Sequence, residues 1–154
     1  MRKQLVSHKL EEAAAGAEWL GLEAAAVEIT SEDAARPIEC ALTGDDTDGW
    51  RASEPGAQTI RLVFDQPQDV HRIYLSFVET TAARTQEFVL RWSPDGTALR
   101  EIVRQQWNFS PDGATRETED YTVHLSGARV LELTIKPNIS SGGDYASLKR
   151  LRLA

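Results

Sequence analysis

The amino-acid sequence predicts an all-β fold, an antiparallel β-sandwich or barrel, preceded by a short N-terminal helix or arm. Three observations lead to this prediction. Apolar and polar residues alternate along many short segments, which is the pattern of half-buried strands. Clusters of turn-forming residues such as Gly, Pro, Asn and Asp separate these segments. Only the N-terminal part of the chain has a composition that favours helix.

Residues 1–26 are predicted to form an N-terminal arm or helix, and residues 27–154 a single β-sandwich domain. Ala, Glu and Leu dominate between Leu10 and Ala26 and favour helix, although Gly16 and Gly21 weaken that preference. The 154 residues are enough for one domain with a proper core and too few for two domains of ordinary size.

The clearest predicted strand runs from Gln86 to Trp92. Its even-numbered residues from Gln86 to Trp92 share one face, which is mostly apolar, and the odd-numbered residues share the other. The segment Ser93-Pro94-Asp95-Gly96 ends the strand, because proline presets a turn and glycine accepts the left-handed conformation. We therefore predict a central strand that ends in a tight turn, with Trp92 in the core.

The connections between the remaining strands differ in length. Short turns are predicted at 65–69, 93–97 and 126–129, and long loops at 31–57, 78–86, 108–119 and 136–145. Successive antiparallel strands place their connections alternately at the two ends of the sandwich. We therefore expect the long loops to share one end, where binding loops on a rigid scaffold commonly gather.

Composition narrows the class of protein. The chain is 41% hydrophobic and 27% charged, and no apolar run approaches the roughly 20 residues of a membrane span. Glu11 and Glu12 stand where a secretory signal would have its apolar core, so no export signal is predicted. Cys40 is the sole cysteine, which excludes an intrachain disulfide. A cytoplasmic location is expected.

The overall charge argues against nucleic acid as a partner. The formal net charge is -7 and the pI is about 5.0, so the protein is negatively charged at neutral pH and repels phosphate backbones. A short basic cluster at 149–152 alternates with leucines. We interpret it as the charged outer face of a last strand.

Several weak motifs occur in a recognisable order: Ala41–Gly44 followed by Trp50, Gln58–Phe64, Val70–Ile73, Arg84 ahead of Phe88–Gly96, and Val130–Ile135. In order and spacing the segment from Val27 to Ala154 resembles the discoidin family, the F5/8 type C domains of coagulation factors V and VIII, and the related galactose-binding-like jelly-roll carbohydrate modules. In that family, loops at one end of the sandwich hold a sugar, a lipid head group or a protein. The resemblance implies a β-sandwich of the jelly-roll type with Trp50 in its core. It also implies a noncatalytic module that binds a carbohydrate or similar polar ligand. The alternative is an intracellular protein-interaction or assembly module on the same fold.

The family also implies a possible calcium ion beside the first loop. Thr43 stands where the family usually has aspartate, and Ser147 stands near a position where many calcium-binding members have glutamate. Both differences remove anionic ligands, so calcium is predicted to be absent or weakly bound. The remaining candidate ligands are Asp45, Asp46 and Asp48, which are more readily explained as turn and cap residues.

The candidate ligand-binding residues all lie in or beside the long loops: Glu79, Arg84, Trp107, Asn108, Asn138 and Tyr145. Glu79 and Arg84 can hold a ligand through charge-assisted hydrogen bonds, or they can pair with each other as a salt bridge. Trp107 can stack on a sugar ring or belong to the core. No nucleophile elbow or comparable arrangement occurs in the sequence, so no catalytic residue is predicted.

Overall fold

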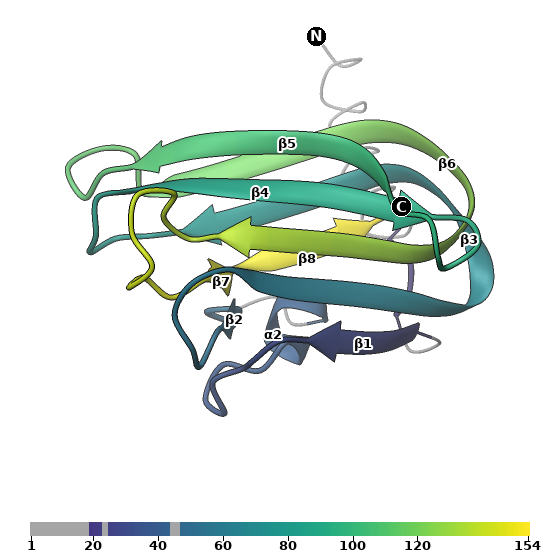
Figure 1. Cartoon of the computed structure of the whole chain (residues 1–154), viewed down its shortest axis with the longest axis horizontal. Coiled ribbons are helices and arrows are strands. Elements are labelled where there is room, and N and C mark those ends of the chain that lie inside the picture. The colour runs from purple at the N-terminus through teal and green to yellow at the C-terminus, as the bar shows by residue number, and fades with distance from the viewer. Residues whose placement is uncertain (1–18, 23–24, 44–46) are drawn as a thin grey trace, which may run out of the picture.

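Two long strands, β3 (Gln58–Val78) and β6 (Arg116–Lys136), organise the computed structural model of the chain. They pair antiparallel along almost their whole length. The pairing is irregular between Val63 and Arg72, and in this region both strands bend (Figure 1). Such irregularities let a strand turn a corner, so that each strand belongs to both layers of a sandwich.

The remaining elements are shorter. The structure describes residues 19–22, 25–43 and 47–154. Within these ranges the other elements are, in chain order, β1 (Ala25–Ile29), α2 (Glu39–Leu42), β2 (Trp50–Arg51), β4 (Arg84–Ser93), β5 (Arg100–Phe109), β7 (Ser147–Leu148) and β8 (Arg150–Leu153).

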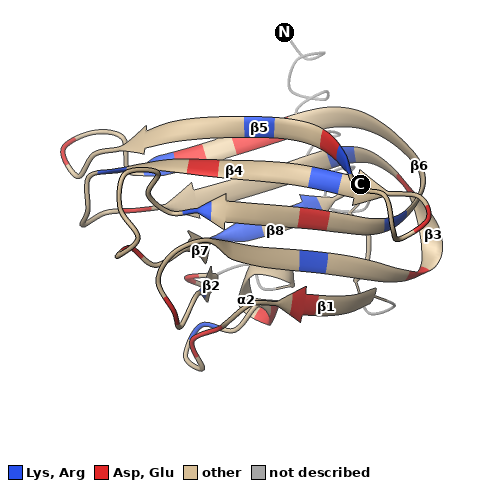
Figure 2. Cartoon of the chain, viewed as in Figure 1, with Lys and Arg blue, Asp and Glu red and all other residues tan. Residues whose placement is uncertain are grey.

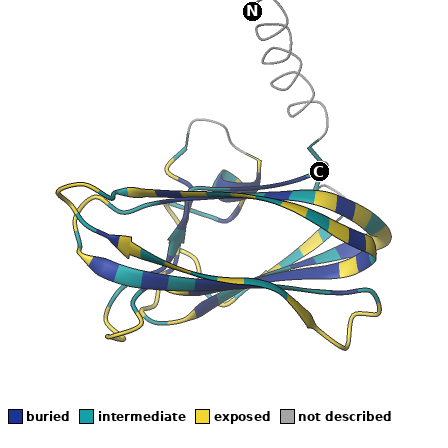
Figure 3. Ribbon diagram, turned by 90° about the horizontal axis from the view of Figure 1, so that it is seen from above, coloured by how far each residue is buried: buried dark blue, intermediate teal, exposed yellow. Residues whose placement is uncertain are grey.

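Strand pairing defines two layers. The first contains β1, the first half of β3, the second half of β6, β4 and β5, in that order. The second contains the first half of β6, the second half of β3, and β8. Strands β2 and β7 form a small separate sheet. All these pairs are antiparallel, and Figure 3 shows the two layers from the side. The predicted all-β sandwich is confirmed.

Apolar side chains from both layers fill the space between them. Phe77 of the second layer stacks on Phe88 of the first, with ring centroids 5.3 Å apart. Trp50 is fully buried, as predicted, and its Nε1 donates a hydrogen bond of 3.1 Å to the carbonyl oxygen of Ser31. Trp92 is partly buried and packs against this core. Burial of apolar surface at about 25 cal/mol per Å² makes this core the main source of stability.

The predicted turn after β4 is confirmed. The Asp95 Oδ1 atom accepts hydrogen bonds from the backbone N–H groups of Thr97, at 2.8 Å, and Ala98, at 3.1 Å. Gly96 has a φ of +82°, the left-handed conformation that the sequence predicts for it. This turn therefore owes its shape to local residues alone.

The two other short turns were predicted wrongly, because the chain bends there without leaving the strand. Segment 65–69 lies inside β3, and 126–129 lies inside β6. The two bends contact each other, since the N–H group of Gly127 donates a 2.8 Å hydrogen bond to Asp69 Oδ1. Proline, glycine and aspartate suit a bulged corner as well as a turn, so the sequence pattern does not distinguish the two.

The predicted N-terminal arm lies only partly within the described residues. Residues 1–18 and 23–24 fall outside them, so the structure does not test the predicted helix. The Leu20 N–H donates a 2.7 Å hydrogen bond to the carbonyl oxygen of Leu153, and the Trp19 ring packs near Tyr74. The described part of the arm therefore packs on β3 and β8.

The predicted charged outer face of the last strand needs one correction. Arg152 is buried, and its Nη1 atom donates to the carbonyl oxygens of Ala41, at 2.9 Å, and Leu42, at 2.7 Å. These carbonyls lie in α2. A basic residue that satisfies otherwise unpaired carbonyls can be buried, which the alternation with leucine did not reveal.

The outer face of the first layer carries a row of alternating charges (Figure 2). Glu28, Arg61, Glu132 and Arg91 are cross-strand partners on β1, β3, β6 and β4. The closest approaches along the row are 3.6, 2.6 and 3.6 Å. Since each charge in this row faces an opposite charge, the row is neutralised within the protein.

The long loops share one end of the sandwich, as predicted (Figure 1). Backbone hydrogen bonds join them: the N–H group of Glu79 donates to Thr115, that of Ile139 to Thr85, and that of Gly56 to Asp144, at 2.8, 2.9 and 3.0 Å. We call this region the loop end.

Candidate functional site

A polar cavity of about 380 Å³ lies at the loop end. We call it the basic pocket, because four of its lining residues are cationic and two are acidic. Five separate parts of the chain contribute to it, and the residues are Arg36, Asp48, Arg51, Val78, Glu79, Thr80, Thr81, Arg116 and Lys149. Its volume lies within the usual range of small-ligand sites.

Two of the cations are held by backbone carbonyl groups. Arg36 donates from Nη2 to the carbonyl oxygen of Asp48, and Lys149 donates from Nζ to that of Thr47. Gly49 follows with a φ of +78°, and a Cβ atom there would lie 2.2 Å from the carbonyl oxygen of Leu148. Only glycine permits this approach, so Gly49 brings the first loop against the segment that carries Lys149.

Glu79 is held by its neighbours on the next loop. Its Oε1 atom accepts a 2.7 Å hydrogen bond from Arg84 Nε, and its Oε2 atom accepts bonds from the N–H groups of Thr81 and Ala82. Burial alone would raise the pKa of Glu79, but these bonds, led by that from Arg84, lower it below its ordinary value. The carboxylate is therefore charged at neutral pH.

Arg84 forms the salt bridge that the sequence analysis left open as an alternative. Its side chain is 1% exposed, and its guanidinium lies 4.8 Å from the centre of the Phe109 ring. Its Nη1 atom donates to the carbonyl oxygen of Pro137, at 2.6 Å, and to Gln86 Oε1, at 3.1 Å. Arg84 therefore ties together three of the segments that build the loop end. Direct contact between Arg84 and a ligand stays a prediction.

A buried polar chain continues from Arg84 into the sandwich. Gln86 Nε2 donates a 3.2 Å hydrogen bond to Glu117 Oε1, and Glu117 is fully buried. Burial, followed by the hydrogen bond and charge of nearby Glu119, raises the pKa of Glu117 to about 8. The carboxyl group of Glu117 therefore holds its proton at neutral pH.

Tyr145 is the exposed aromatic residue at the loop end, with 39% of its surface accessible. The guanidinium of Arg51 lies over its ring, 5.1 Å from the centroid. Because Arg51 lines the basic pocket, the Tyr145 ring lies beside that pocket.

A second, shallower hollow of about 330 Å³ brings together three predicted residues, Arg84, Asn108 and Asn138. Asn108 Oδ1 accepts a 2.6 Å hydrogen bond from Thr85 Oγ1. Asn138 Nδ2 donates to Asp144 Oδ2 at 2.9 Å. Each amide keeps part of its hydrogen-bonding capacity for a ligand.

Trp107 lies apart from both cavities. It pairs across the strands with buried Gln86 and is partly buried against the core. Its Nε1 atom is buried and has no hydrogen-bond partner among the described residues. Trp107 therefore faces the inside of the sandwich rather than the loop end.

The candidate calcium ligands are only partly visible. Asp45 and Asp46 lie outside the described residues, and Asp48 lines the basic pocket. Within the described ranges, no three acidic, histidine or cysteine side chains gather as a metal site. Carbonyl groups of this loop are instead bonded to Lys149 and Arg36. The described residues do not by themselves make up a calcium site, and weak or absent calcium binding stays a prediction.

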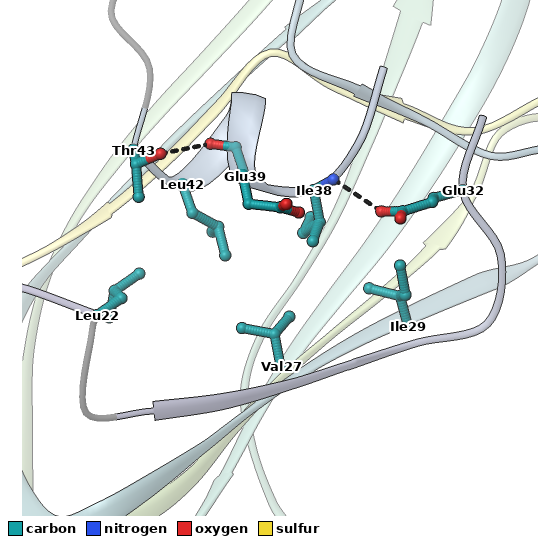
Figure 4. Close-up of a pocket in the computed structure, with 8 residues that line it drawn as sticks. All are labelled: Leu22, Val27, Ile29, Glu32, Ile38, Glu39, Leu42 and Thr43. Atoms are coloured by element: carbon teal, nitrogen blue, oxygen red, sulfur yellow. Dashed lines mark hydrogen bonds between the residues drawn. The ribbon is translucent and has the colours of Figure 1, made fainter. Parts of the chain in front are cut away.

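A third cavity, of about 350 Å³, lies between β1 and α2 (Figure 4). Leu22, Val27, Ile29, Ile38 and Leu42 give it mostly apolar walls. Glu32 at its edge is bonded to the Ile38 N–H group at 3.0 Å. With so few free polar groups, this cavity suits a polar ligand much less well than the basic pocket does.

The four cations of the basic pocket were not predicted as site residues. Arg36, Arg51, Arg116 and Lys149 lie far apart in the chain, and no local spacing connects them. The one available signal was their position beside loops that were expected to meet at one end. Their convergence depends on the strand order, which a single sequence did not provide.

Comparison with known proteins identifies the fold. No family model and no curated protein matches the chain. The module CBM32-3 of a family 31 glycoside hydrolase from Clostridium perfringens matches with a TM-score of 0.65 and 18% identity, over 91% of this chain and 96% of that chain. The family 32 module of C. perfringens NanJ, solved with galactose, matches with a TM-score of 0.63 and 14% identity, over 88% of this chain and 96% of that chain. Chitosan-binding module 1 of a chitosanase/glucanase from Paenibacillus sp. IK-5 matches with a TM-score of 0.60 and 19% identity, over 85% of this chain and 95% of that chain.

These matches show that the chain has the galactose-binding-like jelly-roll fold of the family 32 carbohydrate-binding modules. The predicted discoidin-type architecture is thereby confirmed. None of the helices among the described residues is both long and apolar enough to cross a bilayer.

Proposed function

We propose that this protein is a noncatalytic carbohydrate-binding module whose ligand binds at the loop end. The observation that carries the proposal is an exposed aromatic ring, Tyr145, beside a polar cavity at the loop end of this fold. Aromatic rings pack against the apolar face of a sugar, while polar groups bind its hydroxyls. The solved structures with this fold that are described above include modules that bind galactose and chitosan.

Individual residues take different roles in this proposal. Tyr145 packs against a sugar ring, and the hydroxyl of Thr80 hydrogen-bonds with a hydroxyl group of the sugar. Asn108 and Asn138 extend the site into the second hollow. Glu79 and Arg84, which were predicted as direct ligand contacts, contribute by holding the loops in place and, where a ligand reaches them, by charge-assisted hydrogen bonds.

Affinity electrophoresis against a panel of neutral and acidic polysaccharides tests the proposal. At least one polysaccharide should retard the protein, and Tyr145→Ala should weaken that binding about tenfold through loss of the aromatic contact. Leu99→Ala is the matched control, since Leu99 is also 39% exposed but lies in the β4–β5 turn at the opposite end. Equal effects of the two substitutions would contradict the proposed site.

The alternative, a protein-interaction or assembly module, is separated by a pull-down from the native host. A protein partner that is recovered with the wild type and lost with Tyr145→Ala, together with no retardation by any polysaccharide, would favour the alternative. Retardation by a polysaccharide without a co-purifying protein favours carbohydrate binding.

A further inference from the structure

We infer that the basic pocket selects a sugar that carries a negative charge, either a uronic acid or a sulfate ester. This inference rests on the proposed carbohydrate binding and specifies which sugars bind. It starts from a contrast in charge. The whole chain has 24 acidic and 17 basic residues, whereas the basic pocket is lined by four basic and two acidic residues. The balance of the protein is thus reversed at this cavity.

The acidic side chains of the pocket do not neutralise its cations. Glu79 is engaged by Arg84, which does not line this pocket, and by two backbone N–H groups. Asp48 forms no ion pair within 4 Å with a described residue. A net positive potential therefore remains inside the cavity.

The four cations are available in two ways. Arg36 and Lys149 bond to neutral carbonyl oxygens, which fix their positions and leave their charge uncompensated. Arg51 and Arg116 are exposed, and neither side chain forms a hydrogen bond or ion pair with a described residue. The pocket thus has two anchored cations and two whose hydrogen-bond donors are free.

The chemistry of these groups suits an anionic sugar. The planar fork of an arginine binds a carboxylate or a sulfate through paired hydrogen bonds. Arg51 lies over the Tyr145 ring, 5.1 Å from its centre, so a charged substituent bound by the arginine lies next to this aromatic side chain. The Thr80 hydroxyl also lines the cavity and suits a neutral hydroxyl group of the sugar, whereas the Thr81 hydroxyl already donates a 3.1 Å hydrogen bond to Glu79 Oε2.

The overall charge of -7 repels an anionic ligand at long range. Such a ligand therefore binds where local cations outweigh that repulsion, as they do in the basic pocket. At 0.15 M ionic strength the Debye length is about 8 Å, so salt weakens the interaction between exposed charges that lie farther apart than this. Binding of the acidic sugar should accordingly weaken as salt is raised.

Calorimetric titration with matched oligosaccharides tests the inference. Three pairs are used, with galacto, gluco and manno configurations, each as the neutral sugar and as its uronic acid, together with 6-sulfated forms of the neutral sugars. We expect at least one charged member to bind about tenfold more tightly than its neutral partner, as one charge-assisted contact provides. Preference for the uronic acid or for the sulfate identifies the anionic group.

Two substitutions and one control locate the effect. Arg51→Gln and Arg116→Gln should each lower the preference for the charged sugar over its neutral partner about tenfold. Arg100→Gln is the control: Arg100 is exposed, lies 5.4 Å over the Trp92 ring, and stands at the opposite end of the sandwich. It changes the net charge equally and should leave binding unchanged. All three side chains are exposed, so folding is expected to persist and is checked by the melting temperature.

Neutral sugars that bind as tightly as their charged partners would overturn the inference and leave the proposed function intact. An equal loss in Arg100→Gln would also overturn it, because the effect would then come from net charge. No binding to any sugar of the set or to the polysaccharide panel would overturn both proposals.

Discussion

Glu79 and Glu117 lie at the two ends of one buried hydrogen-bonded chain and differ in charge at neutral pH. Arg84 and Gln86 connect them through contacts of 2.7, 3.1 and 3.2 Å. The pKa of Glu79 is lowered, so this residue is a carboxylate, whereas the pKa of Glu117 is raised to about 8, so this residue is a neutral acid.

The difference shows that the neighbours of a buried carboxyl group, more than its burial, decide its charge. Burial favours the neutral form of both groups. At Glu79, Arg84 and two backbone N–H groups outweigh burial. At Glu117, the nearest ionisable neighbour is another acid, Glu119, which adds to the effect of burial. The loop end therefore keeps a fixed charge, and the interior holds a proton.

Removal of the cation that links the two ends should have the largest effect. Arg84→Ala leaves Glu79 without its charged partner and also removes the hydrogen bond to the Pro137 carbonyl oxygen. We expect the free energy of unfolding to fall by about 3 to 5 kcal/mol. Urea denaturation at pH 7 measures it. Arg104→Ala is the control, because Arg104 also pairs with two glutamates but lies on the surface. The urea midpoint of this variant should barely differ from that of the wild type. Equal shifts would contradict the structural role of Arg84.

Glu117→Gln should stabilise the protein at alkaline pH. The raised pKa means that the folded state keeps a proton which the unfolded chain loses above its ordinary pKa of about 4.5. Stability from this group is therefore complete below pH 4.5 and is lost progressively up to about pH 8. Glutamine remains neutral, so at pH 8.5 the variant should melt about 5 °C above the wild type. At pH 4.5 the two should melt together, and a constant difference at both pH values would refute the assignment.

Glu79→Gln should show the opposite pH dependence, with a smaller magnitude. Because the pKa of Glu79 is lowered, its stabilisation is present above the ordinary pKa of about 4.5 and is lost as pH falls through the lowered value. We expect the variant to be less stable by about 1 kcal/mol at pH 7. Urea midpoints at pH 7 and pH 3 should show this difference shrinking with acidity. A difference that grows in acid would mean that Glu79 is not the charged member of the chain.

The parts of the fold that depend on local sequence could be predicted. Strand β4 and its turn at Asp95 and Gly96 follow from alternation and from residue types within a few positions. The long loops were expected at one end because antiparallel order places them there. The bends within β3 and β6 could not be separated from turns, since the same residues serve both.

The candidate site was predicted less completely than the fold. Tyr145 lies at the loop end, and Asn108 and Asn138 meet there, as the long-loop argument implied. Trp107 faces inward, because its cross-strand partner Gln86 belongs to the buried face of β4. That pairing depends on a register that only the folded sheet reveals, and the same is true of the cations in the basic pocket.

The continuous strands β3 and β6 have a consequence for how the molecule unfolds. Each strand contributes hydrogen bonds to both layers, so neither layer can detach while the other stays paired. The β4–β5 hairpin lies between them in the chain, and the β3–β6 ladder closes around it. The sandwich should therefore open in one cooperative transition. The segments around the basic pocket are attached to the ends of these strands, so a ligand held there stabilises the whole domain by mass action.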